Sequence, residues 1–233
     1  MTDRYLSVAR EGGHEIEIKR SRFLCALAPV TSADAARAVI AARRKAEPAA
    51  RHHCHAFVLG PDGRTQRSSD DGEPAGTAGT PMLEVLRRRE LTDTVAVVTR
   101  YFGGVLLGAG GLIRAYGTAV SEAIDAVGVA EYRRLRLVEV SVAYDRAGRL
   151  ENDLRASPYV LRGTRFDDRA HFEVGLAPGE SSAFTAWLAD LTGGETAPAD
   201  LGESWVRVKD SGAFRAVLTA RNAHEPLPPT PRG

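Results

Sequence analysis

The residues of this sequence that are best suited to chemistry lie in two glycine-rich stretches. In one of them, Gly103 and Gly104 follow Tyr101 and Phe102 directly, at the end of an apolar run. Glycine tolerates positive φ and lets another backbone approach closely, so a sharp turn is predicted at this strand end. An aromatic side chain exposed beside such a turn could stack on a nucleic-acid base. Core packing at a strand end would explain the same aromatic residues, so both interpretations stay open.

A further group of glycines leads into a predicted helix. These glycines are Gly108, Gly110 and Gly111. A helix start has free N–H groups and a partial positive charge, so it could hold a phosphate, and Arg100 and Arg114 flank it. The alternative is that the glycines only permit tight packing of strand and helix. The GxxxxGK[ST] motif is absent, and GxGxxG fails because Ile113 stands where the third glycine should be.

The other glycine-rich stretch, SDDGEPAGTAGT from Ser69 to Thr80, is acidic and has no periodicity, which predicts a loop. Its candidate residues are Asp70, Asp71, Gly72, Glu73, Pro74, Gly76 and Gly79. Clustered carboxylates could hold Mg²⁺ or Ca²⁺, but the DxDxDG spacing of an EF-hand is absent. Asp and Ser side chains can instead cap loop amides. We favour that structural role, and the sequence predicts no metal site and no cofactor.

The run HHCH, from His52 to His55, looks like a metal site. Alternate side chains of a strand face opposite sides of the sheet, so His53 and His55 would share one face. His52 and Cys54 would share the other. A zinc site normally takes three or four protein ligands, and the sequence holds no second Cys/His pair. Because GxSxG is also absent, the sequence predicts no catalytic residue.

The apolar patterning that must position these residues predicts an α+β chain. Strands are predicted at EIEIK and FLCALAPV, at HHCHAFVLG, at Arg64–Ser68 and at TDTVAVVTRYF. One helix should begin after Thr31 or Ser32, and a second at Thr80 with Pro81 in its first position. A third should run from about Leu112 to Val127 and stop at Gly128.

The second half of the chain is predicted to form a separate small domain. From about Leu135 to Lys209 the expected order is βαββαβ, the ferredoxin-like arrangement. We therefore predict a first domain at residues 1–131 and a second at 132–209. The remaining residues, 210–233, are proline-rich and are predicted to form a disordered tail.

The composition restricts the class of protein. Of the 233 residues, 43% are hydrophobic and 26% are charged, as in an ordinary soluble globular protein. No apolar run suits a membrane span and the first residues do not resemble a secretory signal, which favours the cytoplasm. With 31 basic and 30 acidic residues, the chain lacks the positive excess of a general nucleic-acid binder. An RNA partner would therefore need a local basic patch.

Three segments together resemble the IMPACT family, also known as the YigZ family. They are RHHCHAF at Arg51–Phe57, SDDGEPAGTAGTPML at Ser69–Leu83 and VVTRYFGGVLLGAGGLIRAYG at Val97–Gly117. The resemblance covers about Ser21–Val127, and the βαββαβ segment looks like the family's second domain. It implies that the first domain is similar to the fourth domain of elongation factor G, with a left-handed βαβ arrangement, and the second domain to the fifth. Both relatives work on ribosomal RNA.

Two functions remain open. The first is a cytosolic, non-catalytic RNA- or ribosome-associated module that regulates translation. The resemblance implies this role because eukaryotic family members look like regulators of translation. They act through a partner protein, and we do not expect this chain to share that partner. Its surface would combine the Gly72–Gly79 loop with Arg100, Tyr101, Phe102, Gly103, Gly104 and Arg114. We expect the two glycine-rich stretches to converge on an electropositive cleft, with no membrane partner and no DNA specificity.

The second function is a nucleotide- or phosphate-dependent enzyme, since the resemblance also implies a fold shared with small-molecule kinases. Gly108–Gly111 would then hold phosphates, and Asp70, Asp71 or Glu73 would bind Mg²⁺. No lysine lies near the glycine loop and no general base is evident, which argues against catalysis. The sequence leaves the oligomeric state open.

Overall fold

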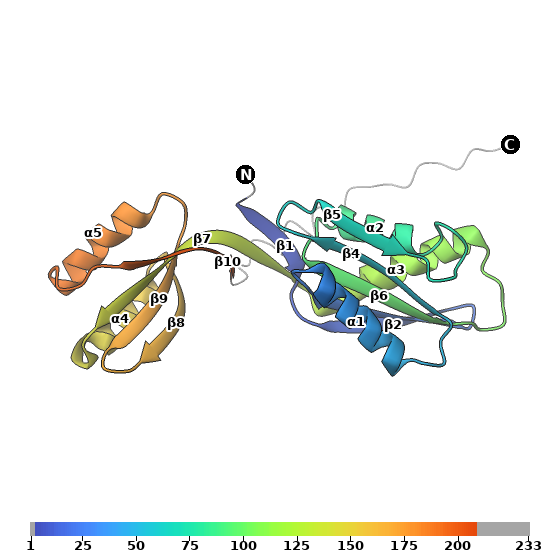
Figure 1. The fold of residues 1–233 in the computed structure, drawn as a ribbon, viewed down its shortest axis with the longest axis horizontal. Helices are drawn as coiled ribbons and strands as arrows, with labels where there is room; N and C mark the ends of the chain where they lie inside the picture. Colours follow the sequence, from blue (N-terminus) through green and yellow to red (C-terminus); the bar gives the residue numbers. More distant parts are fainter. Residues whose placement is uncertain (1–2, 209–233) are drawn as a thin grey trace.

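A computed structural model describes residues 3–208 of the chain, which form two groups of elements (Figure 1). This part of the chain contains five helices and ten strands in two five-stranded sheets. The architecture is therefore a mixed α/β one with two domains, as predicted. None of the helices in residues 3–208 is both long enough and apolar enough to cross a bilayer.

The first sheet carries both glycine-rich stretches. Its strands are β2 (Gly12–Ile18), β3 (Ser21–Pro29), β4 (His52–Leu59), β5 (Thr65–Ser69) and β6 (Thr94–Tyr101). Their order across the sheet is β2-β3-β6-β4-β5, and every neighbouring pair is antiparallel. β3 and β4 are therefore parallel to each other, with β6 between them and the helix α1 (Ala33–Ala46) connecting them. This is a βαβ connection, as the resemblance implied.

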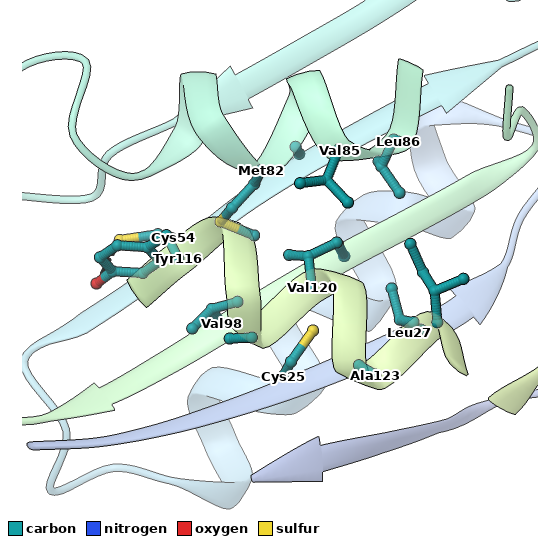
Figure 2. Close-up of a cluster of buried hydrophobic side chains, with 14 of the residues drawn as sticks. Cys25, Leu27, Cys54, Met82, Val85, Leu86, Val98, Tyr116, Val120 and Ala123 are labelled. Atoms are coloured by element: carbon teal, nitrogen blue, oxygen red, sulfur yellow. Dashed lines mark hydrogen bonds between the residues drawn. The ribbon is translucent and has the colours of Figure 1, made fainter. Parts of the chain in front are cut away.

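Helices cover both faces of the first sheet. α1 packs on one face, where Ala36 and Ile40 meet Phe57 and Val97 of the strands. α2 (Gly79–Arg88) and α3 (Ala109–Val127) pack on the other. Figure 2 shows this second core, in which strand residues Cys25, Leu27, Cys54 and Val98 face helix residues Met82, Val85, Leu86, Tyr116, Val120 and Ala123. The core anchors the start of α3 and the end of β6, where the glycine-rich turn lies.

The helix ends show which local sequence signals were sufficient to predict where a helix begins or stops. Ser32 caps α1, since its Oγ accepts a hydrogen bond from the Ala35 N–H at 3.1 Å, as predicted. α3 begins at Ala109, three residues before the predicted start, and stops at Gly128 with φ +77°. The prediction that Thr80 caps α2 was wrong. α2 begins at Gly79, and its side-chain cap comes from Asp70 in the preceding loop.

The second sheet belongs to the predicted ferredoxin-like domain. Its elements are β7 (Val129–Val142), α4 (Tyr144–Ala156), β8 (Val160–Phe166), β9 (Ala170–Leu176), α5 (Ser181–Thr192) and β10 (Ala199–Arg207). The order along the chain is βαββαβ, and the antiparallel order across the sheet is β10-β7-β9-β8. Leu154 and Leu188 of the helices bury Val140 and Phe172 of the strands. The ferredoxin-like prediction is confirmed.

One strand was missed, and it connects the two sheets. β1 (Arg4–Val8) pairs with the start of β7, although Val8 packs into the core of the first domain. β7 itself runs without a break across the predicted boundary at residues 131 and 132 (Figure 1). The position of that boundary stays a prediction. The predicted tail, residues 210–233, lies outside the described residues.

Candidate nucleic-acid interface

The acidic loop between β5 and α2, residues 70–78, is organised by its own carboxylates. Asp70 accepts hydrogen bonds from the N–H groups of Gly76, Ala78 and Gly79 at 2.8, 3.0 and 2.8 Å. Burial raises the pKa of Asp70, but the three backbone donors outweigh it and hold the pKa below its usual value. Asp70 therefore closes the loop and caps α2.

Asp71 ties the same loop to the far side of the sheet. Its backbone is in the left-handed region, with φ +42°. Its carboxylate accepts the His53 N–H at 2.7 Å and pairs with Arg44 of α1. Burial raises the pKa of Asp71, but the hydrogen bond from the His53 N–H and the pairing with Arg44 outweigh burial. The pKa is therefore below its usual value, and the carboxylate stays charged. Both partners of this residue are groups of the protein itself.

Glu73 makes the most deeply buried polar contact of the loop. Its Oε1 lies 2.7 Å from Arg100 Nη1, and the two side chains are only 4% and 7% exposed. The Tyr116 hydroxyl donates to the same oxygen at 2.8 Å, and Cys54 Sγ lies 3.3 Å from that hydroxyl. Burial raises the pKa of Cys54 to about 12, so its thiol stays protonated. The prediction that Arg100 contacts phosphate is thereby corrected, because Glu73 neutralises it below the surface.

These contacts also correct the hypothesis of a magnesium site. Asp70, Asp71 and Glu73 each accept hydrogen bonds from donors of the protein, which lie in the loop itself, in β4 and in β6 respectively. They are therefore not directed at a common point. In residues 3–208, ligand atoms close enough to share an ion occur at Asp167, Asp168 and His171 of the second domain. The kinase-like use of the loop has no support from this geometry.

The other glycine-rich stretch, residues 102–114, lies against the turn Lys19–Arg20. We call these two segments together the tip. Gly103 lies directly against the backbone of Arg20, since a Cβ on Gly103 would be 2.0 Å from the Arg20 carbonyl carbon. The Gly103 N–H donates to Ser21 Oγ at 3.1 Å. Gly104 then takes a φ of +82°. The predicted sharp turn is confirmed, and its close approach to β2–β3 explains the glycine.

The tip is also where the first domain exposes apolar side chains. Leu106 is 84% exposed and Phe102 is 58% exposed, and Val105 and Ile113 are exposed as well. All large hydrophobic side chains that are exposed in residues 3–128 belong to this segment. A contiguous exposed apolar group usually marks an interaction site.

The tip also exposes three cations. Arg114 is exposed on the first turns of α3, and Lys19 and Arg20 form the exposed two-residue turn between β2 and β3. In the described part of the chain, no carboxylate pairs with any of the three. Sequence reasoning found Arg114 and missed the lysine–arginine pair. The available signal was the two-residue gap between two strand-like runs, which is a hairpin turn.

Some of the remaining predicted site residues have a packing role, and others are exposed at the surface. Tyr101 is half-buried, its hydroxyl donates to Glu47 at 2.7 Å, and the Arg22 guanidinium lies 5.5 Å from its ring centroid. It therefore has a packing role. Gly108 precedes α3 with φ +71° and offers no side-chain cap. The exposed glycines at this helix start are Gly108 and Gly110, whereas Gly111 is half-buried.

The two glycine-rich stretches do converge, because Glu73 of the acidic loop reaches Arg100 of β6 and Tyr116 of α3. The neighbouring loop residues Gly72, Pro74 and Gly76 are exposed. The positive charge expected between the stretches is nevertheless neutralised. Exposed cations that have no carboxylate partner among the described residues do occur on the tip, at Lys19, Arg20 and Arg114.

Comparison with known proteins places this geometry in a family. Residues 19–124 match the family described as the Impact N-terminal domain, and residues 140–195 match the domain of unknown function DUF1949. IMPACT family member YvyE of Bacillus subtilis (strain 168) is 45% identical over 196 residues, which cover 84% of this chain and 90% of YvyE. The chain belongs to the IMPACT family.

Two further proteins are similar to this chain over most of its length. IMPACT family member YigZ of Escherichia coli (strain K12) is 38% identical over 180 residues, covering 76% of this chain and 88% of YigZ. A crystal structure described as that of a hypothetical protein covers 91% of this chain and 100% of its own, with a TM-score of 0.58 and 33% identity. The acidic loop and the tip both lie within the matched Impact N-terminal domain.

Proposed function

We propose that this IMPACT family member is a non-catalytic RNA- or ribosome-associated protein that acts in the regulation of translation in the cytoplasm. The observation that carries the proposal is the tip, where Lys19, Arg20 and Arg114 are exposed with no carboxylate partner in residues 3–208. We propose neither a membrane partner nor specificity for DNA.

The physical argument starts from the cations. Arginine grips a phosphate through a planar fork of donors, and each cation that neutralises a phosphate releases counterions. The whole chain has a formal net charge of only +1, so long-range attraction to a polyanion is weak. Contact with RNA must then come from a local group of unpaired cations. The tip supplies such a group.

The start of α3 supports the same assignment. No side chain caps the helix at Gly108, and Gly108, Ala109 and Gly110 are exposed. The first N–H groups of this 19-residue helix therefore have no side-chain acceptor. Together with the helix dipole they favour an anion, and Arg114 lies one turn further along. A backbone phosphate at this end of α3 would meet both.

Cosedimentation of the protein with ribosomes over a series of salt concentrations tests the proposal. We expect Arg114→Ala and Arg20→Ala each to weaken binding and to reduce the slope of log affinity against log salt by about one. Arg88→Ala is the matched control. Arg88 is also exposed, but it ends α2 next to Arg89, which contacts Asp125 near the opposite end of α3.

The control should leave both the affinity and the salt slope unchanged. Equal binding by the wild type and both tip variants across the salt series would contradict the proposal. So would a wild type that does not sediment with ribosomes and binds no RNA.

A further inference from the structure

A column of side chains runs from the core of the first domain to its surface at the tip. The rings of Tyr116 and Phe23 meet edge to face, with centroids 5.3 Å apart. The Arg100 guanidinium lies 5.4 Å from the centroid of Phe23 and 5.8 Å from that of Phe102. Arg100 is thus shared between a buried ring and an exposed one, and Phe102 is the outermost member of the column.

The column is held in place by the acidic loop and by Ser21. Glu73 pairs with Arg100 at 2.7 Å, which fixes the guanidinium beneath Phe102. Ser21 Oγ lies 3.5 Å from Arg100 Nη2 and accepts the Gly103 N–H at 3.1 Å, directly after Phe102 in the chain. The backbone and the ring are therefore both positioned before any ligand arrives. The ring nevertheless stays largely exposed, with 58% of Phe102 accessible to solvent.

We propose that Phe102 stacks on an unpaired base, so that the tip selects single-stranded or looped RNA over duplex RNA. We further propose that the buried Glu73–Arg100 pair positions the ring for this contact. The inference rests on the proposed function, since it names the class of RNA that the tip would take.

The physics of stacking favours this substrate class. In a duplex both faces of each base are covered by neighbouring bases, whereas an unpaired base offers a free π-face to an aromatic ring. A cation beneath an aromatic ring is attracted to it, so Arg100 holds the inner face of Phe102 and the outward side remains for a base. The backbone of Arg20 lies against Gly103, the residue after Phe102, and the exposed Lys19, Arg20 and Arg114 of the tip could hold the flanking phosphates.

The aliphatic neighbours of Phe102 raise a different possibility, an apolar protein surface as partner. Val105 and Leu106 lie close to Phe102 in the sequence, are exposed, and cannot stack on a base. Stacking and apolar burial are separated by Phe102→Leu, which keeps an apolar side chain and removes the π-face. Leu106→Ser provides the opposite test, because it removes apolar surface and leaves the ring.

The experiment is fluorescence anisotropy with a short labelled single-stranded RNA and the same RNA annealed into a duplex. We expect the wild type to prefer the single strand and Phe102→Leu to lower that affinity about tenfold, with the duplex affinity unchanged. Phe102→Trp should restore single-strand binding, and Leu106→Ser should leave it unaltered. Because Phe102 is exposed, its variants should fold, and thermal melts check this.

A double-mutant cycle tests the positioning role of Glu73. Glu73→Gln should weaken single-strand binding in the wild-type background and cause no further loss when Phe102 is already leucine. A purely structural effect of Glu73→Gln would lower the affinity equally in both backgrounds and would overturn the positioning role.

The outcomes separate this inference from the function on which it rests. Binding of neither RNA by the wild type would remove the proposed function itself. Equal binding of single strand and duplex, unaffected by Phe102→Leu, would leave RNA binding in place and overturn the inference. An apolar protein partner would be indicated if Leu106→Ser abolished ribosome cosedimentation while Phe102→Leu had no effect, and that outcome would also overturn it.

Discussion

The acidic loop and the tip are both rich in glycine, but they differ in whether the protein itself supplies partners for their charged groups. In the acidic loop the carboxylates of Asp70, Asp71 and Glu73 all accept donors from the protein, and Glu73 does so with only 4% of its side chain exposed. In the tip, Arg20 and Arg114 are exposed and no carboxylate of residues 3–208 pairs with them. One loop is closed on itself and the other is open to a partner.

The difference shows that a glycine-rich loop is best classified by whether its hydrogen-bonding and charged groups have partners inside the protein. Buried polar groups need partners inside the protein, so a loop whose side chains supply those partners acts as scaffold. A loop whose cations lack partners and whose apolar side chains are exposed has surface left for a ligand. The two regions therefore have different roles. The acidic loop stabilises the strand end that carries the tip, and the tip is left to contact a ligand.

Replacing Arg100 should give the largest effect and tests this division directly. Arg100→Ala leaves Glu73 buried without its cation, and breaking a buried ion pair by removing one partner costs about 3–5 kcal/mol. Urea denaturation should show this loss in the free energy of unfolding. Arg114→Ala, which removes an exposed and unpaired arginine, should change it by less than about 0.5 kcal/mol. Similar losses in the two variants would break the comparison.

The fold was predictable because it depends on local patterns. Alternation of apolar residues identified the strands, and Ser32 and Gly128 marked helix ends that the structure confirms. The cap of α2 was not predictable in this way. Asp70 reaches Gly79 across nine positions of an irregular loop, and no short-range rule signals such a contact. β1 escaped because its pairing partner begins at Val129, far along the chain.

The candidate site was predictable in its glycines and not in its charges. Close backbone approach leaves a strong signal at Gly103, since only glycine fits against Arg20. The state of an arginine depends on its partner instead, and the partner of Arg100 is Glu73, on a different element. Residue type alone therefore suggested a phosphate ligand where the structure has a buried ion pair.

A smaller effect is expected for Asp70, and it should depend on pH. The folded protein holds the pKa of Asp70 below its ordinary value of 3.8, so the charged form stabilises the fold. This stabilisation is fully present above about pH 4 and is lost as the pH falls through the folded pKa. We expect Asp70→Asn to lower the free energy of unfolding by about 1–2 kcal/mol at neutral pH. The difference from wild type should shrink below about pH 4.

Chemical denaturation of both proteins across the acid range measures this difference. Asp62→Asn serves as control, because the Asp62 carboxylate pairs with the exposed Arg64 at 3.1 Å and such pairs contribute little. A difference for Asp70→Asn that stayed constant down to the lowest pH would refute an electrostatic cap.

The smallest effect, with opposite signs in the two regions, is expected from relieving backbone strain. Lys19 and Arg20 have φ of +48° and +65°, where asparagine and glycine are preferred in a two-residue hairpin turn. Lys19→Asn combined with Arg20→Gly should raise stability by about 1 kcal/mol and weaken ribosome binding, because two free cations are lost. Asp71 has a similar φ of +42°, yet Asp71→Gly should lower stability, since its contacts with Arg44 and His53 disappear. Thermal melts measure the stability of both variants, and cosedimentation measures their ribosome binding. We expect the strained residues of the tip to lower stability and to contribute to binding, whereas the strained Asp71 of the acidic loop stabilises the fold.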